Sequence, residues 1–162
     1  MIPDPGFAGD TGTADPALVE ALADHAAGGP SAAVLMALQD ARLLVPVVAV
    51  LGEVETDDQG LAHDKTSDMA AVLMQGADGR TALLSFTGTA ALAAWDPQSR
   101  PVPVPARLAA TSALQDGAAA LLVDVAGPVR YVVEGDDLTA LAAGWRLVTA
   151  GEQTAWIRPP EQ

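Results

Sequence analysis

The run from Leu43 to Leu51 constrains the fold of this 162-residue chain most strongly. It is apolar throughout, is rich in valine and is interrupted by Pro46. It is too short and too β-branched for a good helix, and it lacks the alternation of a strand with one solvated face. We therefore predict a strand buried on both faces. Pro46 donates no ladder hydrogen bond, so it must lie at an edge or a bulge.

Further strands follow from short apolar runs bounded by turn residues. Asp78-Gly79 between two such runs is a hairpin signal, because glycine accepts the positive φ of a tight turn. The region 52–67 is polar and poorly patterned, so we predict a loop there. The predicted strands are 69–75, 80–86, 118–125, 129–134, and a last hairpin of 145–149 and 153–157.

Helices are indicated by apolar residues at helical spacing and by capping residues. Asp15 precedes Pro16, an N-cap followed by proline at the first helical position, and Ser31 can cap the second helix. Asp136 or Asp137 can cap the last one. Three alternating prolines over 101–105 predict an extended segment that cannot pair normally in a ladder. The predicted helices are 15–26, 31–41, 89–95, 106–115 and 136–143.

Interleaved helices and strands, with at least two hairpins, predict a single α/β (α+β) domain. Its mixed β-sheet would be flanked by helices, because a purely parallel array has no hairpins. We predict a flexible arm at 1–14, the domain at 15–157 and a tail at 158–162. Within the domain, the hairpin of residues 145–157 is expected to be a C-terminal addition.

Charge and composition exclude several functions. Eight Lys and Arg stand against 21 Asp and Glu, a net charge of −13, which disfavours nucleic acid and anionic membranes. There is no cysteine, so thiolate metal sites and cysteine nucleophiles are excluded. No signal peptide and no apolar stretch of membrane-spanning length is present, so we expect a cytoplasmic protein.

Catalytic and ligand-binding patterns are weak. The acidic segment 57–68 holds oxygen and imidazole ligands but matches no known metal motif, and a solvated loop is the favoured interpretation. Lys65 and Ser67 have the spacing of a nucleophilic pair, but the favoured interpretation is structural, with Lys65 and Asp68 at the entry to a strand and Ser67 as a turn residue. No nucleotide-binding glycine pattern is present. We therefore assign no catalytic residue, no cofactor and no metal.

The group from Trp95 to Pro105 is the best candidate for an interaction surface. Trp and Arg are enriched in interface hot spots, and the prolines preset an extended segment. The predicted surface consists of Trp95, Asp96, Arg100, Pro101 and Pro103. The alternative is structural: Trp95 fills the helix end, and Arg100 pairs with Asp96 or with a helix carbonyl. Trp145 and Trp156, on the last hairpin, form a second candidate patch.

Several short motifs in order resemble the N-terminal domain of the SseB (enhanced serine sensitivity) family, from residue 43 to about residue 143. They are Arg42-Leu-Leu-Val-Pro-Val, Lys65-Thr-Ser-Asp-Met69, Asp78-Gly79-Arg80, Thr81-Ala-Leu-Leu-Ser-Phe86-Thr87, Trp95-Asp96-Pro97, Arg100-Pro101-Val-Pro-Val, and 118–124 with Gly127-Pro128. The resemblance implies an α/β domain, often encoded alone and cytoplasmic. It implies no catalytic residues.

The sequence therefore predicts a non-catalytic protein-interaction or regulatory module with an unidentified protein partner. The alternatives are a small-molecule or metal-binding sensor with segment 57–68 as its lid, and an enzyme using Asp and Arg in a cleft. A flat apolar patch would favour the first hypothesis, and a concave pocket with convergent polar groups the others. Self-association through the last hairpin is a further alternative, since that hairpin offers a sheet edge.

Overall fold

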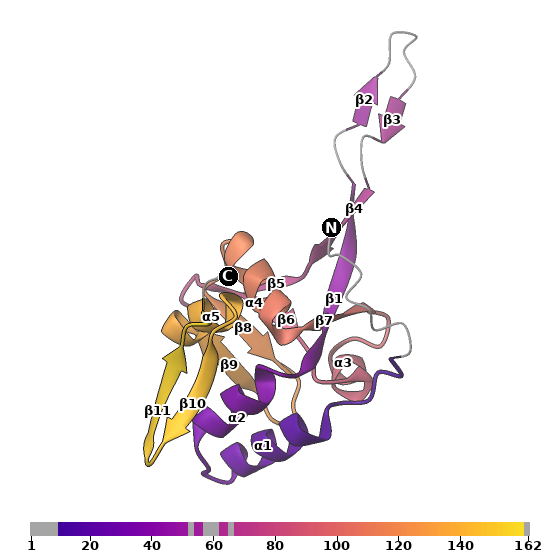
Figure 1. Ribbon diagram of the computed structural model, residues 1–162. Helices are drawn as coiled ribbons and strands as arrows, with labels where there is room; N and C mark the ends of the chain where they lie inside the picture. The colour runs from indigo at the N-terminus through magenta and orange to yellow at the C-terminus, as the bar shows by residue number, and fades with distance from the viewer. Residues whose placement is uncertain (1–9, 52–53, 57–61, 65–66, 161–162) are drawn as a thin grey trace.

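Two β-sheets meet in the computed structural model of the protein, which describes residues 10–51, 54–56, 62–64 and 67–160 (Figure 1). The first is antiparallel, with strand order β4 (Ser67–Ala71), β1 (Arg42–Leu51) and β7 (Arg100–Pro105). The second is mixed, with order β5 (Leu73–Gln75), β6 (Thr81–Ser85), β8 (Ala120–Val123) and β9 (Tyr131–Glu134). Among the described strand pairs of this sheet, β6 and β8 are parallel and the others are antiparallel. The predicted α+β domain with a mixed sheet is confirmed.

The two sheets are joined at Leu44 and Phe86. Each of these residues donates its main-chain N–H to the other's carbonyl, over 2.7 and 2.8 Å. The strand predicted over 69–75 is divided at Val72, so that β4 pairs with β1 and β5 pairs with β6. Val72 stays in register by accepting a hydrogen bond from the Leu84 N–H at 3.0 Å. One apolar run therefore serves both sheets.

The prolines of β1 and β7 all avoid the ladder between these strands. The main-chain N–H and C=O of Leu44 point toward Phe86. Because these groups point to opposite sides at successive residues of a strand, those of residues 43 and 45 point toward β7. Pro101, Pro103 and Pro105 lie opposite the even-numbered residues of β1 and turn their nitrogens to the outer edge. The prediction that these prolines prevent ladder pairing is wrong, because their spacing of two places every missing donor on the unpaired side.

In the described part of the chain, five helices surround the sheets, at the positions the sequence predicts to within a few residues. They are α1 (Pro16–Ala26), α2 (Ser31–Leu38), α3 (Thr89–Trp95), α4 (Ala106–Gln115) and α5 (Gly135–Ala142). Two capping predictions are wrong. Ser31 is the first residue of α2 and hydrogen-bonds the Tyr131 hydroxyl at 2.5 Å. Asp136 and Asp137 lie in the first turn of α5, where the helix dipole favours them, and Glu134 holds the cap position.

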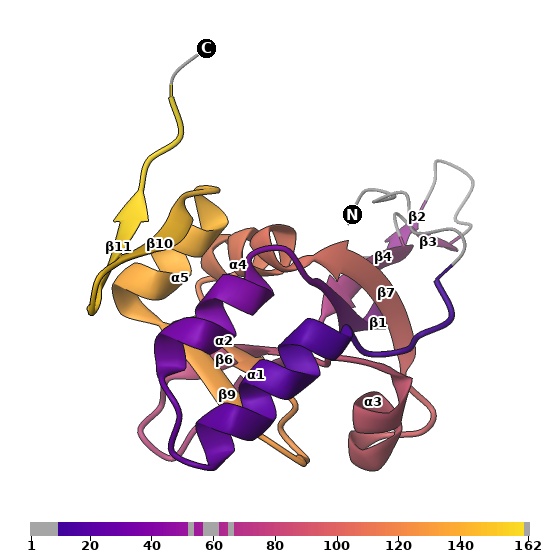
Figure 2. The ribbon, with the colours of Figure 1, turned by 60° about the horizontal axis from the view of Figure 1, so that its bottom comes forward.

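The helices divide the core between the two faces of the mixed sheet. Leu83, Leu121 and Val133 point to the larger cluster, which contains buried residues of α1, α2, α4 and α5. Leu84 and Leu122 point to a smaller cluster with α3. The helices α1 and α2 lie side by side across the face of the mixed sheet that carries the larger cluster (Figure 2). No helix in the described part of the chain is long and apolar enough to span a membrane.

Two hairpins complete the fold. The predicted C-terminal hairpin is confirmed as β10 (Arg146–Ala150) and β11 (Gln153–Ile157). Arg146 anchors it to Asp40 through two hydrogen bonds of 2.7 and 3.1 Å. The predicted loop 52–67 instead contains β2 (Val54–Thr56) and β3 (Ala62–Asp64), which pair antiparallel.

A proline at a position of β7 whose N–H points to β1 should disrupt the sheet. Removal of a proline whose nitrogen faces the outer edge should not. We expect Val102→Pro to lower the free energy of unfolding by at least about 1–3 kcal/mol, because it leaves the Val45 carbonyl opposite it without a donor. Pro103→Ala should change it by less than about 1 kcal/mol. Urea titration of both variants measures the difference. Equal effects would contradict this assignment of the ladder.

Candidate functional site

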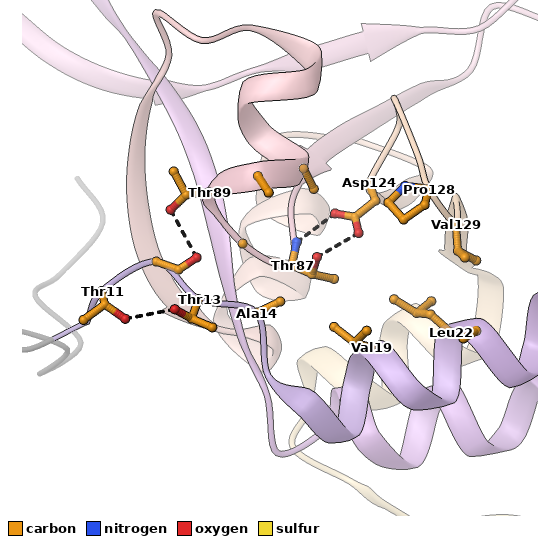
Figure 3. A pocket seen from close by; sticks show the side chains of 15 residues that line it. Thr11, Thr13, Ala14, Val19, Leu22, Thr87, Thr89, Asp124, Pro128 and Val129 are labelled. Atoms are coloured by element: carbon orange, nitrogen blue, oxygen red, sulfur yellow. Dashed lines mark hydrogen bonds between the residues drawn. The ribbon is translucent and has the colours of Figure 1, made fainter.

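A concave cavity of about 580 Å³ lies where the two parallel strands of the mixed sheet end (Figure 3). Ligand sites of α/β sheets form at such carboxyl ends of strands. The arm before α1, the helix α1 itself, the junction of β6 with α3, and the turn between β8 and β9 each contribute one wall. The lining consists of Thr11, Gly12, Thr13, Ala14, Val19, Leu22, Ala23, Thr87, Gly88, Thr89, Ala90, Ala91, Asp124, Pro128 and Val129.

Asp124 is the buried polar centre of this pocket. It directly follows β8, is 2% exposed and has a φ of 53°, which few non-glycine residues adopt. Its carboxylate accepts hydrogen bonds from the Thr87 main-chain N–H and hydroxyl, both at 2.8 Å. Its own N–H donates to the Ser85 carbonyl at 3.0 Å. Asp124 thereby ties the ends of β6 and β8 together.

Burial raises the pKa of Asp124 above its ordinary value. The two hydrogen bonds from Thr87 act in the opposite direction, because they stabilise the charged carboxylate, but their effect is smaller. The pocket therefore contains a carboxylate whose negative charge is poorly solvated.

Arg42 holds the arm that forms one wall of the pocket. Its guanidinium pairs with the Asp10 carboxylate, donating to Oδ1 at 2.9 Å. It also donates to the carbonyls of Thr13, at 2.6 Å, and Thr87, at 2.9 Å. Residues 10–14, which the sequence assigns to a flexible arm, are therefore part of the packed domain.

Two glycines let the arm approach the start of α3. The carbonyl of Gly12 accepts the Thr89 N–H at 2.8 Å. A Cβ on Gly12 would lie 1.9 Å from the Thr89 hydroxyl, and Gly12 has a φ of 81°. A Cβ on Gly88 would lie 2.8 Å from the Ala14 nitrogen. Any side chain at either glycine would push this wall of the pocket outward.

The predicted interaction surface lies elsewhere. Trp95 is half-buried and packs on Phe86 with ring centroids 5.5 Å apart, as the structural alternative had it. Asp96 accepts a hydrogen bond from the Gln98 N–H at 2.9 Å, and among the described residues it forms no ion pair with Arg100.

The other three residues of the predicted surface, Arg100, Pro101 and Pro103, belong to β7. Arg100 and Pro101 are exposed at its start, and Pro103 is half-buried at its outer edge. The five residues are near one another in the chain, and none of them lines the cavity at the ends of β6 and β8. Their role as an interaction surface stays a prediction.

Trp156, from the second candidate patch, and His25 each pack against a neighbouring element. Trp156 lies opposite Leu147 in the last hairpin, packs against the larger core and donates its indole N–H to Asp137 at 2.9 Å. His25 packs edge-on against Tyr131, with ring centroids 5.4 Å apart. Trp145 immediately precedes β10 and is half-buried.

The acidic segment lies largely outside the described residues. No side chain is described for its candidates, Asp57, Asp58, His63, Asp64, Lys65, Ser67 and Asp68. Elsewhere in the described part of the chain, no group of three or more His, Asp or Glu is placed to hold a metal ion.

Sequence reasoning did not identify Asp124 and Thr87 as site residues. Each is a polar residue directly after an apolar run, which is a weak signal for the carboxyl end of a strand. The signal becomes informative only once β6 and β8 are known to be parallel neighbours, because this pairing brings the two residues together.

The stability of the protein should depend on the ionisation of Asp124. Because its pKa is raised in the folded state, the unfolded chain ionises first as the pH rises above about 4. Wild type should therefore lose stability relative to Asp124→Asn from about pH 4 upward, until the pH passes the raised pKa. Urea titrations between pH 4 and 7 measure this difference. Asp116→Asn, at an exposed position, controls for the lost charge, and a difference independent of pH would contradict the prediction.

Comparison with families of known proteins gives a match that covers most of the chain. Neither a curated protein nor a solved structure matched the chain. The family model of the SseB protein N-terminal domain matches residues 18–140. The match runs from α1 into α5, so it includes both N-terminal helices, which the resemblance from residue 43 onward left out. The chain therefore belongs to the SseB N-terminal domain family.

Proposed function

We propose that this protein is a non-catalytic binding module whose pocket receives a small, largely apolar ligand. The observation that carries this proposal is the concave cavity with one buried carboxylate at the carboxyl ends of β6 and β8. Its volume is within the range of small-molecule sites, and its walls are mainly aliphatic. These features favour the small-molecule alternative over a flat docking patch.

The chemistry of the lining supports binding rather than catalysis. Asp124 is the one ionisable side chain among the lining residues that the structure describes. Both of its oxygens already accept hydrogen bonds from Thr87, and the lining contains no second acid or base for proton transfer. The Thr87 hydroxyl donates to Asp124 at 2.8 Å, but the lining holds no third group that would orient this carboxylate as a base, as nucleophilic sites require.

A neutral aromatic probe should bind in the pocket. We expect benzyl alcohol to shift the amide resonances of Thr87, Gly88 and Val129 saturably in a ¹⁵N–¹H NMR titration. Ala23→Phe should abolish the response, because Ala23 lines the pocket from α1 and a phenyl ring there occupies the space.

Ala17→Phe is the matched control for this experiment. Ala17 is an exposed alanine of the same helix and does not line the pocket. The control should bind as wild type does. Absence of a saturable response, or an equal response in both variants, would overturn the assignment of the pocket as a binding site.

A protein-interaction role through the surface around β7 is the second candidate function. The exposure of Arg100 and Pro101 at the start of β7 supports it. Wild type and Arg158→Ala, another exposed arginine, should then capture the same stoichiometric partner from native-host extract, and Arg100→Ala should lose it. Capture that is unaffected by Arg100→Ala would exclude this surface.

A further inference from the structure

The charge of Asp124 has no cationic partner among the described residues. The ion pairs there involve other carboxylates: Asp10 with Arg42, Glu134 with Arg80, and Asp40 with Arg146. Arg42 does not line the pocket, and it donates to the Thr87 carbonyl rather than to the Asp124 carboxylate. A buried carboxylate is normally paired with a cation, because its desolvation is otherwise uncompensated.

The carboxylate also retains acceptor capacity. Each of its oxygens has two lone-pair sites, and Thr87 occupies one on each. Thr87 thereby fixes the orientation of the carboxylate without exhausting it. In Figure 3 the Asp124 and Thr87 side chains lie together at the edge of the space that Val19, Leu22 and Val129 also border.

The other polar side chains of the lining are largely engaged. The Thr89 hydroxyl donates to the Gly12 carbonyl at 3.1 Å, and the hydroxyls of Thr11 and Thr13 hydrogen-bond each other at 3.1 Å. A ligand therefore meets one strong polar feature, the buried negative charge, within otherwise aliphatic walls.

From these observations we propose that the pocket selects ligands with an ammonium group attached to a small apolar body. The proposal rests on the proposed binding function and adds the ligand class. An ammonium group supplies both the missing positive charge and the donors for the free acceptor sites of Asp124. A carboxylate or phosphate ligand is disfavoured, because it would place a second negative charge beside a buried one.

Three probes of one shape test the charge preference: benzylammonium, benzyl alcohol and benzoate. At neutral pH we expect wild type to bind benzylammonium about tenfold or more tightly than benzyl alcohol, since hydrogen bonds between charged groups are the stronger ones. Benzoate should bind most weakly. Asp124→Asn should bring benzylammonium to the affinity of benzyl alcohol, and Ala23→Phe should remove binding of both. Dissociation constants come from the NMR titration.

A second measurement needs no substitution at Asp124. The ¹³C resonance of the Asp124 carboxyl group in wild type should titrate at lower pH when benzylammonium is present, because the cation stabilises the charged form. Benzyl alcohol should leave this titration in place. This readout keeps the proposal testable even if Asp124→Asn does not fold.

The outcomes separate the two proposals. If benzyl alcohol binds in the pocket and benzylammonium binds no more tightly, the pocket remains a binding site and the ammonium preference is wrong. If benzylammonium binds more tightly but Asp124→Asn does not reduce the difference, general attraction to the acidic surface explains it and the preference is again wrong. If no probe binds, both proposals fall.

Discussion

The structure around the pocket depends on the hydrogen bonds at Thr87. Its N–H and hydroxyl donate to Asp124, and its carbonyl accepts from Arg42. Through Asp124 it joins the ends of two parallel strands, and through Arg42 and Asp10 it connects them to the arm before α1. Because these groups share one residue, the walls of the pocket are positioned together. The cavity is thus a consequence of the contacts that Thr87 makes at the carboxyl ends of β6 and β8.

Local sequence signals determined the elements well and their pairing poorly. The helix over 106–115 and the hairpin at the C-terminus are where the sequence predicts them, because periodicity and turn residues are local properties. The division of one apolar run at Val72 and the parallel contact of β6 with β8 depend on residues distant in the chain. Asp124 was missed for the same reason, since its partner Thr87 lies 37 positions away.

The prolines of β7 show that one pattern can have two physical consequences. Alternate prolines remove every second donor, so the strand can pair on one side but not on the other. In this structure the paired side faces β1 and the blocked side is the outer edge of the sheet. The number of prolines alone predicted that the strand would not pair. Their spacing of two instead leaves the side toward β1 free to pair and protects the outer edge against addition of a further strand.

The identity of residue 124 bears on what the pocket is for. An asparagine there would tolerate the positive φ equally well and could make the same two contacts with Thr87, since its carbonyl accepts and its amide donates to the hydroxyl oxygen. It would do so without the desolvation that raises the pKa of the carboxyl group. The hydrogen bonds from Thr87 offset this desolvation only in part, and the uncompensated charge is the physical reason to propose that it recognises a ligand.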